Sequence, residues 1–218
     1  MFAQYLLCKP NKFNFYIYWE IFETMSYSVL LVIDAQHTFI ADTNRWSRRN
    51  NPRFESNVST LISAYRAAGE PIIFFLHQDS DPGWGPGPNY RLMDFLDVRP
   101  EDVVLHKTTR SCFTSTDLQR RLNSLGAPRL VVTGIQTEQC CETTARDAGD
   151  LGYEVDFVTE ATLTFPIPHW AGGSELGTKA ITERTEYALA RRFARIRSVA
   201  QVVADLSAAE LTPGLPPS

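Results

Sequence analysis

A chain of 218 residues, 44% hydrophobic and 21% charged, has the length and composition of one globular domain and not of a disordered or fibrous protein. Its formal net charge of −4 argues against a nucleic-acid-binding protein, in which basic side chains gather on one face. No stretch of about 18 apolar residues is present, which excludes a membrane-spanning helix. We therefore expect no nucleic-acid partner and no membrane partner.

The four cysteines, Cys8, Cys112, Cys140 and Cys141, have neither the density nor the spacing of a disulfide scaffold. They also lack the paired Cys or Cys/His spacing of a structural zinc site. We expect free thiols in a reducing compartment, and therefore a cytoplasmic protein.

One domain is predicted over residues 26–210. Residues 1–25 are rich in aromatic side chains that polar residues interrupt, and they lack the small-residue cleavage site of a signal peptide. We expect them to be an extension or arm outside the core, with Met25 as the natural start. An arm that packs on a partner subunit is the alternative. Residues 211–218, with three prolines, are expected to form a flexible tail.

The predicted elements alternate between strands and helices. Continuous apolar runs predict strands buried on both faces, and apolar residues at helical spacing predict helices. In chain order we predict a strand over 28–34, a helix over 55–68, a strand over 71–76, a long irregular segment over 78–100, a strand over 103–105, a helix over 116–125, a strand over 129–134, a helix over 138–151, a strand over 153–158, a helix over 179–195 and a short strand near 196–199. This alternation predicts an α/β domain with a mostly parallel sheet and helices on both faces.

Three of the predicted strands end next to residues that could take part in a reaction. Asp34 and Lys107 lie at or just beyond strand ends, and the chain turns after Gly134, where another strand ends. Ligands of such folds bind at the carboxyl ends of the strands. We therefore expect one edge of the sheet to bring these segments together.

Cys140 is predicted to lie in the first turn of the helix after Gly134. There the helix dipole and unpaired backbone N–H groups would lower the pKa of the thiol, and the same N–H groups can bind an oxyanion. The alternative is that Cys140 is a small buried hydrophobic residue, as lone cysteines usually are. Cys141 competes for the role, but it lies about 100° further round the helix and would face the sheet. Cys112 is a candidate for the pocket wall.

Three segments resemble the isochorismatase-like hydrolase family, in the right order and at the right spacing. Residues 134–148, GIQTEQCCETTARDA, resemble the family's Gly-apolar-x-Thr-x-x-Cys turn and the helix that follows it. Residues 31–39, LVIDAQHTF, resemble its opening strand and aspartate, and residues 104–118, VLHKTTRSCFTSTDL, resemble its lysine segment. The similarity extends from about residue 28 to residue 199. It implies an isochorismatase-like, Rossmann-like three-layer α/β/α sandwich.

The resemblance implies that Asp34, Lys107 and Cys140 form a catalytic triad. Cys140 would be the nucleophile, Asp34 the general base and Lys107 a fixed positive charge. An ordinary ion pair at the strand ends is the alternative for Asp34 and Lys107, and the two interpretations are compatible. The resemblance also implies a cis peptide bond between Ile135 and Gln136. This bond would turn the N–H of Gln136 toward an oxyanion, beside the N–H of Cys140.

The presence of Cys140 favours cleavage of a C–N bond in a small amide, ureide or carbamoyl substrate through a thioester. The alternatives are an isochorismatase-type enol-ether hydrolase, which needs no thiol, and an inactive family member acting as a binding module. Nicotinamidases hold a metal through an Asp-x-His pattern, which is missing from the segment with His77, Asp79 and Asp81. We therefore expect no metal and no cofactor, with His77 as a hydrogen-bonded residue at a strand end.

Residues that flank the three matched segments are candidates for the walls of a small-molecule substrate pocket. These candidates are Gln36, Phe39, Trp84 and Phe113. The family tendency and the apolar Pro/Gly/Trp segment also lead us to expect a homodimer or homotetramer.

Overall fold

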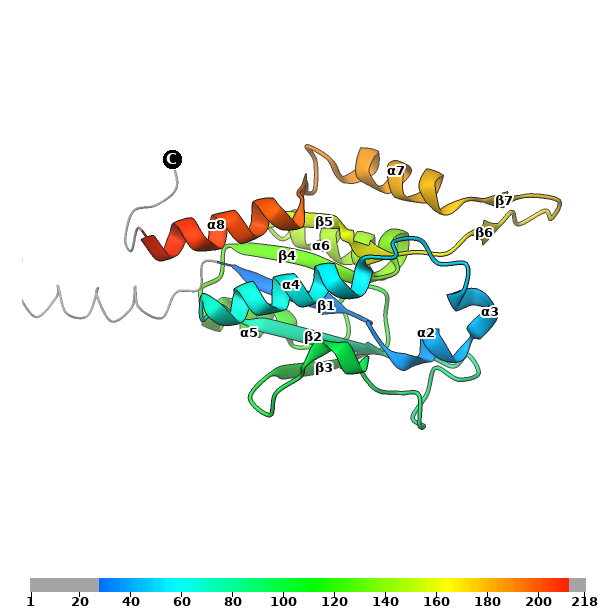
Figure 1. The fold of residues 1–218 in the computed structure, drawn as a ribbon, viewed down its shortest axis with the longest axis horizontal. Helices are drawn as coiled ribbons and strands as arrows, with labels where there is room; N and C mark the ends of the chain where they lie inside the picture. The colour runs from blue at the N-terminus through cyan, green and yellow to red at the C-terminus, as the bar shows by residue number, and fades with distance from the viewer. Residues whose placement is uncertain (1–27, 212–218) are drawn as a thin grey trace, which may run out of the picture.

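The apolar runs of the sequence form the strands of one sheet (Figure 1). Six strands lie in the order β3-β2-β1-β4-β5-β8, and every neighbouring pair is parallel. The strands are β1 (Val29–Ile33), β2 (Ile72–His77), β3 (Val103–Lys107), β4 (Arg129–Ile135), β5 (Glu154–Leu163) and β8 (Arg195–Ile196). The computed structural model describes residues 28–211. The predicted extension over 1–25 and the predicted tail beyond residue 211 lie outside them.

Helices cover both faces of the sheet, because side chains alternate between the faces along each strand. In β1, Leu30 and Val32 pack into the core on one side, whereas Leu31 and Ile33 pack into the core on the other. The first core includes α4 (Phe54–Ala67) and α8 (Val199–Leu211); the second includes α5 (Leu118–Leu125), α6 (Glu142–Asp150) and the end of α7 (Thr178–Leu189). The predicted three-layer α/β/α fold is confirmed.

Shorter elements connect these layers. They are α2 (His37–Ala41), α3 (Thr43–Trp46), the 3₁₀ turn η1 (Asp94–Leu96), the π-helical turn η2 (Thr137–Cys141) and an antiparallel hairpin of β6 (Ile167–Pro168) and β7 (Glu175–Leu176). The hairpin extends away from the sheet beyond α7 (Figure 1). Apart from η2, which the helix predicted over 138–151 partly covers, none of these elements was predicted, because each is too short to show a periodic pattern.

Some predicted boundaries are wrong. The helix predicted over 138–151 is divided into η2 and α6, and the strand predicted over 153–158 continues to Leu163. The helix predicted over 179–195 ends at Leu189, because Arg191 adopts a φ of 65°, which breaks the helix. The basic residues at the end of the predicted helix therefore lie in a turn and in β8. The unpredicted α8 buries Val202 and Leu206.

The close contact between β1 and β4 positions the two segments that follow these strands. Gly134 of β4 has a φ of 122°, and a Cβ atom there would lie 1.9 Å from the carbonyl oxygen of Ile33. Only glycine fits such an approach of two backbones. Asp34, the residue after Ile33, has a φ of 51°, in the left-handed region that aspartate tolerates better than most residues. β1 therefore ends at Ile33, at the level where β4 turns toward η2.

Candidate active site

Asp34, Lys107 and Cys140 converge at the carboxyl edge of the sheet, as predicted. Asp34 follows β1, Lys107 ends β3 and Cys140 lies in η2 after β4. The Nζ of Lys107 is 2.7 Å from Oδ2 of Asp34. An oxygen of Asp34 and the Sγ of Cys140 lie within 4.8 Å of each other and of a ring nitrogen of His77. All three predicted residues are buried, with exposed fractions of 5% or less.

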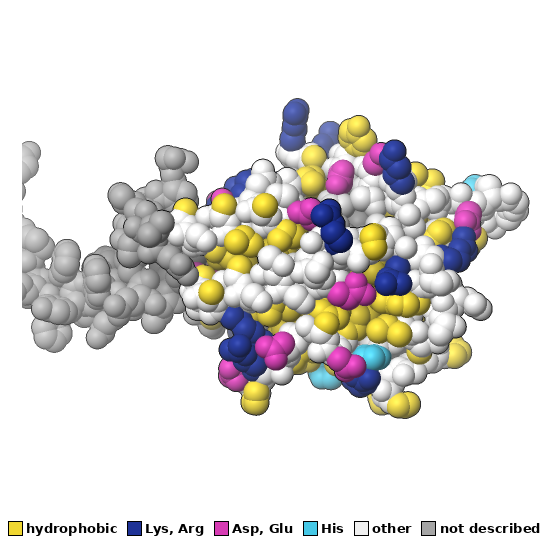
Figure 2. Space-filling view, in the orientation of Figure 1, with side chains coloured by type: hydrophobic (Ala, Val, Ile, Leu, Met, Phe, Trp, Pro, Cys, Tyr) yellow, Lys and Arg dark blue, Asp and Glu magenta, His cyan; other side chains and the backbone are white. Residues whose placement is uncertain are grey.

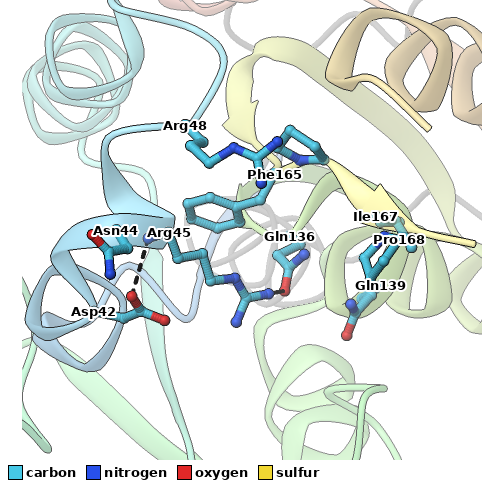
Figure 3. Close-up of a pocket in the computed structure, with 10 residues that line it drawn as sticks. Asp42, Asn44, Arg45, Arg48, Gln136, Gln139, Phe165, Ile167 and Pro168 are labelled. Atoms are coloured by element: carbon cyan, nitrogen blue, oxygen red, sulfur yellow. Dashed lines mark hydrogen bonds between the residues drawn. The ribbon is translucent and has the colours of Figure 1, made fainter. Parts of the chain in front are cut away.

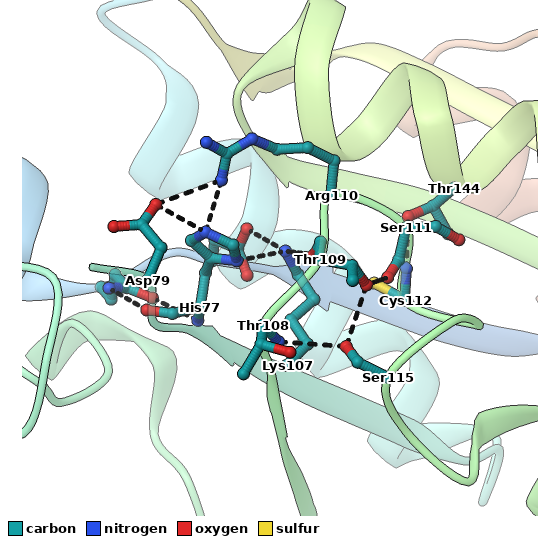
Figure 4. Close-up of polar contacts among 12 residues, drawn as sticks. His77, Asp79, Lys107, Thr108, Thr109, Arg110, Ser111, Cys112, Ser115 and Thr144 are labelled. Atoms are coloured by element: carbon teal, nitrogen blue, oxygen red, sulfur yellow. Dashed lines mark hydrogen bonds and ion pairs between the residues drawn. The ribbon is translucent and has the colours of Figure 1, made fainter. Parts of the chain in front are cut away.

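The ammonium of Lys107 is held by three acceptors (Figure 4). Besides Oδ2 of Asp34, it donates to Nδ1 of His77 at 3.2 Å and to the carbonyl oxygen of Thr109 at 3.1 Å. An ammonium has three N–H donors and accepts nothing. Lys107 is therefore a fixed charge whose donors are all used before any substrate binds.

The two carboxylate oxygens of Asp34 have different environments. Oδ2 pairs with Lys107, whereas Oδ1 is buried and has no hydrogen-bond partner among residues 28–211. A buried acceptor without a partner is costly unless it has a function. Oδ1 is thus the oxygen available to take the proton of the nearby Cys140 thiol.

Burial shifts the pKa values of the two partners of the ion pair in opposite directions. Burial raises the pKa of Asp34 above its usual range, and the charge of Lys107 opposes this shift only in part. Burial alone would lower the pKa of Lys107, but the Asp34 carboxylate outweighs it and the net pKa of Lys107 is raised. The lysine therefore stays charged, and the aspartate is a stronger base than an exposed one.

The pKa of the Cys140 thiol is raised, which contradicts the predicted thiolate. Burial raises this pKa well above its ordinary value, and the negative charge of Asp34 raises it further, while Lys107 opposes the shift. The prediction was wrong because it placed the thiol at an accessible helix N-terminus. Cys140 instead lies in a π-helical turn, beside a buried carboxylate. At rest, Cys140 is therefore a protonated thiol beside the carboxylate of Asp34.

The other two described cysteines belong to the core. Cys141 is fully buried, and burial raises the pKa of its thiol well above the ordinary value. Both Cys140 and Cys141 pack in the core that contains Leu31 and Ile33, but only Cys140 of the two also lines a pocket. Cys112 is also fully buried in that core, and burial raises its pKa to about 12. The expectation that Cys112 lines the pocket is wrong.

An inner pocket of about 200 Å³ opens onto the predicted triad. It is lined by Asp34, Phe39, Arg45, His77, Asp79, Asp81, Trp84, Arg110, Gln136, Gln139 and Cys140. Two predicted wall residues, Phe39 and Trp84, line this pocket, and their rings meet edge to face at 4.8 Å. The other two line neither this pocket nor the outer cavity. Gln36 is fully buried and bonds the backbone of His77, and Phe113 stacks on Tyr153.

His77 connects the buried lysine to charged residues of the pocket wall (Figure 4). Nδ1 of His77 accepts from Lys107, and Nε2 lies 3.1 Å from Oδ2 of Asp79. Arg110 contacts the same Nε2. Burial and the charge of Lys107 lower the pKa of His77, so the ring is neutral. The predicted hydrogen-bonded histidine at a strand end is confirmed.

Sequence reasoning missed two pocket arginines, Arg45 and Arg110. Arg110 lies three residues after Lys107, and this proximity to a matched residue was the available signal. Arg45 is in α3, six residues after the matched segment 31–39, and no sequence pattern pointed to it. A wider outer cavity of about 590 Å³ adjoins the inner pocket and shares Arg45, Gln136 and Gln139 with it.

The peptide bond between Ile135 and Gln136 is cis, as the resemblance implied. It places Gln136 between β4 and η2, where its side chain lines both cavities. That the backbone N–H groups of Gln136 and Cys140 bind an oxyanion stays a prediction.

The residues of this site do not fit a metal ion. Within residues 28–211, Asp34, His77 and Cys140 are the group whose potential ligand atoms lie within 4.8 Å of one another. The Lys107 ammonium already lies between two of them, 2.7 Å from the carboxylate and 3.2 Å from the imidazole. A divalent cation there would meet a buried positive charge, whose repulsion is strong where water is scarce.

Comparisons with known proteins agree with this fold. Residues 28–203 match the family model of the isochorismatase domain. The chain is similar to nicotinamidase 3 of Arabidopsis thaliana (33% identity; 63% of this chain and 74% of the relative) and to ureidoacrylate amidohydrolase RutB of Enterobacter sp. strain 638 (30%; 62% and 75%). The crystal structure of an isochorismatase-family hydrolase from Chromobacterium violaceum superposes with a TM-score of 0.77 at 30% identity, over 85% of this chain and 95% of that one. The chain therefore belongs to the isochorismatase family of hydrolases.

Proposed function

We propose that this protein hydrolyses a C–N bond in a small amide, ureide or carbamoyl substrate through a Cys140 thioester. The observation that carries the proposal is a free carboxylate oxygen, Oδ1 of Asp34, beside a buried protonated thiol in a pocket. The names of the relatives support cleavage of the same type of bond, because nicotinamidase and ureidoacrylate amidohydrolase are both named as enzymes that hydrolyse a C–N bond.

In the first half-reaction, Oδ1 of Asp34 takes the thiol proton while Sγ of Cys140 attacks the carbonyl carbon. The resulting oxyanion collapses, the C–N bond breaks, and the leaving nitrogen takes the proton from Asp34. Because the thiol pKa is raised, proton transfer accompanies attack and no thiolate accumulates beforehand. The products of this half are a free amine or ammonia and a thioester on Cys140.

In the second half-reaction, Asp34 takes a proton from water, and the hydroxide formed attacks the thioester carbon. The C–S bond breaks, and Sγ regains the proton from Asp34. Lys107 keeps Asp34 ionised between these steps and stabilises negative charge on sulfur, while its three filled donors keep it from acting as an acid.

A panel of small amides and ureides, with hydroxylamine as a trap, tests the proposal. We expect at least one panel member to release ammonia or an amine, and hydroxylamine to convert the thioester to a hydroxamate. Hydrolysis without a hydroxamate or a Cys140 adduct by peptide mass spectrometry would exclude the thioester. An enol-ether hydrolase would leave the panel intact yet cleave isochorismate, and a binding module would turn over neither.

Removing metals is expected to leave the rate unchanged, because the Lys107 ammonium occupies the space between the potential ligands. The measurement compares initial rates on the best panel substrate before and after dialysis against EDTA. Loss of activity that added zinc or iron restores would contradict this expectation.

We also propose that the protein forms a homodimer or homotetramer. Trp170 of the β6–β7 hairpin is 92% exposed and Tyr187 of α7 is 86% exposed, so large aromatic rings face solvent in the isolated chain. The Trp84 expected to contribute such surface instead lines the inner pocket. Analytical ultracentrifugation at micromolar concentration should give a mass of two or four chains, and a mass near 24.6 kDa would contradict the proposal.

Surface and cysteine chemistry bear on the remaining expectations. On the face shown in Figure 2, acidic and basic side chains are interspersed, so that face offers no broad positive patch for nucleic acid.

In the part of the chain that the structure describes, no helix is both long and apolar enough to cross a bilayer. Cys112, Cys140 and Cys141 are free. These free thiols support the proposal of a cytoplasmic location.

A further inference from the structure

Arg45 lies at the border between the inner pocket and the outer cavity. It comes from α3 and is one of three residues that line both spaces, with Gln136 and Gln139. Its side chain points away from Asp42 and toward Gln136, across the opening between the two cavities (Figure 3). A substrate that reaches Cys140 and extends into the outer cavity must therefore pass this guanidinium.

The Arg45 guanidinium forms no direct ion pair among the described residues, although the charge of Glu138, which accepts from Nε2 of Gln136 at 3.0 Å, acts on it. The other pocket arginines are paired, Arg110 with Asp79 at 3.4 Å and Arg48 with Glu175. No carboxylate of residues 28–211 lies within 4 Å of the Arg45 guanidinium, whose one side-chain hydrogen bond goes from Nη2 to the neutral Oε1 of Gln136 at 2.6 Å. Asp42 lines the outer cavity as well, but its carboxylate caps the backbone N–H of Arg45 at 3.0 Å.

Two aromatic rings fix the guanidinium in place. Its central carbon lies 4.7 Å from the ring centre of Phe165 and 5.6 Å from that of Phe39. These contacts hold the plane of the group but use none of its N–H donors. A guanidinium has five such donors, and Gln136 takes one. Burial also lowers the pKa of Arg45, and the charges of Asp42 and Glu138 oppose this shift only in part.

Resting on the proposed function, we propose that the substrate carries a carboxylate at the end remote from the scissile bond, and that Arg45 binds it. A planar guanidinium with free N–H groups matches a carboxylate in a two-pronged contact. The bound anion would form the direct ion pair that Arg45 lacks among residues 28–211. Asp79 and Asp81 also line the inner pocket, so their negative charges would repel this group there.

Alkylation of Cys140 by two reagents of nearly equal size tests the charge preference without a known substrate. Iodoacetate is anionic and iodoacetamide is neutral, so the ratio of their rates at Cys140 cancels differences in thiol reactivity. In Arg45→Met, which keeps an apolar side chain between the rings, we expect this ratio to fall about tenfold relative to the wild type. Peptide mass spectrometry gives the rate at Cys140 for each reagent.

Arg49→Met is the matched control. Arg49 belongs to the same segment and lies 4.4 Å from the ring centre of Trp46, yet it lines neither cavity. Its removal should leave the ratio at the wild-type value. An unchanged ratio in Arg45→Met would overturn the proposal. So would an equal slowing of both reagents, because this would show that Arg45 only positions Gln136.

A binding measurement separates this proposal from the proposed function. In Cys140→Ala, calorimetry should show that N-carbamoylglycine binds at least about tenfold more tightly than the neutral hydroxyethylurea, and that adding Arg45→Met removes the difference. Such a difference in a protein that hydrolyses no amide would support the carboxylate site and reject the hydrolase. Equal or absent binding of the two probes would reject the carboxylate site, whatever the panel of amides shows.

Discussion

Replacing Cys140 by alanine should lower turnover of the best panel substrate by at least about 10⁴-fold, because no thioester can form without the sulfur. The fold should survive, since Cys140 lies at the pocket and its neighbours Asp34 and Lys107 keep their ion pair. The measurement is kcat, together with the melting temperature of the variant.

Cys141→Ala is the matched control for this substitution. It also removes one sulfur from η2, but Cys141 is fully buried in the core and does not line either cavity. We expect it to retain most of the wild-type kcat, with some loss of stability from the small void left behind. Full activity in Cys140→Ala and loss of activity in folded Cys141→Ala would reverse the assignment of the nucleophile.

Lys107→Met should lower kcat by about 10³-fold or more, because it removes the charge that keeps Asp34 ionised. The pKa of Asp34 is already raised by burial, and Lys107 is the largest influence holding it down. Without the lysine, this pKa rises further and Asp34 takes up a proton. A protonated carboxyl can no longer accept the proton of Cys140.

The pH profile distinguishes this effect from simple damage to the fold. Activity needs ionised Asp34, so it is lost as pH falls through the raised pKa of that carboxyl. In Lys107→Met the acidic limb of kcat/KM should move to higher pH, and alkylation of Cys140 by iodoacetamide near neutral pH should slow. Profiles that overlap with the wild type in both measurements would show that Lys107 does not act on this site, and the triad would have to be abandoned.

The strands were predictable from sequence because each is an apolar run buried on both faces. Val29–Ile33 has no exposed residue, and its continuous apolar pattern fits only the interior of a parallel sheet. The end of α7 was not predictable in the same way. The arginines after Leu189 continue a helical pattern of polar and apolar positions, but Ala190 has a non-helical ψ of 132° and Arg191 a positive φ, and together they end the helix.

Convergence of the site was predictable, but its electrostatics were not. The positions of Asp34 and Lys107 at strand ends follow from the order of a parallel sheet. The direction of the Cys140 pKa depends on how deeply the thiol is buried and how near it lies to Asp34. Neither quantity can be predicted from the local sequence, which indicated only a helix N-terminus. Arg45 shows the same limit, because its place is set by packing on Phe165, a residue 120 positions away in the chain.

The contact between Gly134 and Ile33 links the proposed base and the proposed nucleophile to the same place in the sheet. Asp34, the proposed base, follows Ile33, and the turn after Gly134 carries Cys140, the proposed nucleophile, so their separation is set close to where the two backbones touch. No side chain lies between the strands at this point to be trimmed or repacked. Substitutions elsewhere in the two cores would therefore reduce the fraction of folded molecules while leaving the turnover of each folded molecule unchanged. In evolutionary terms, the helices and loops can diverge widely, while a single glycine preserves the separation of Asp34 and Cys140 on which the proposed chemistry depends.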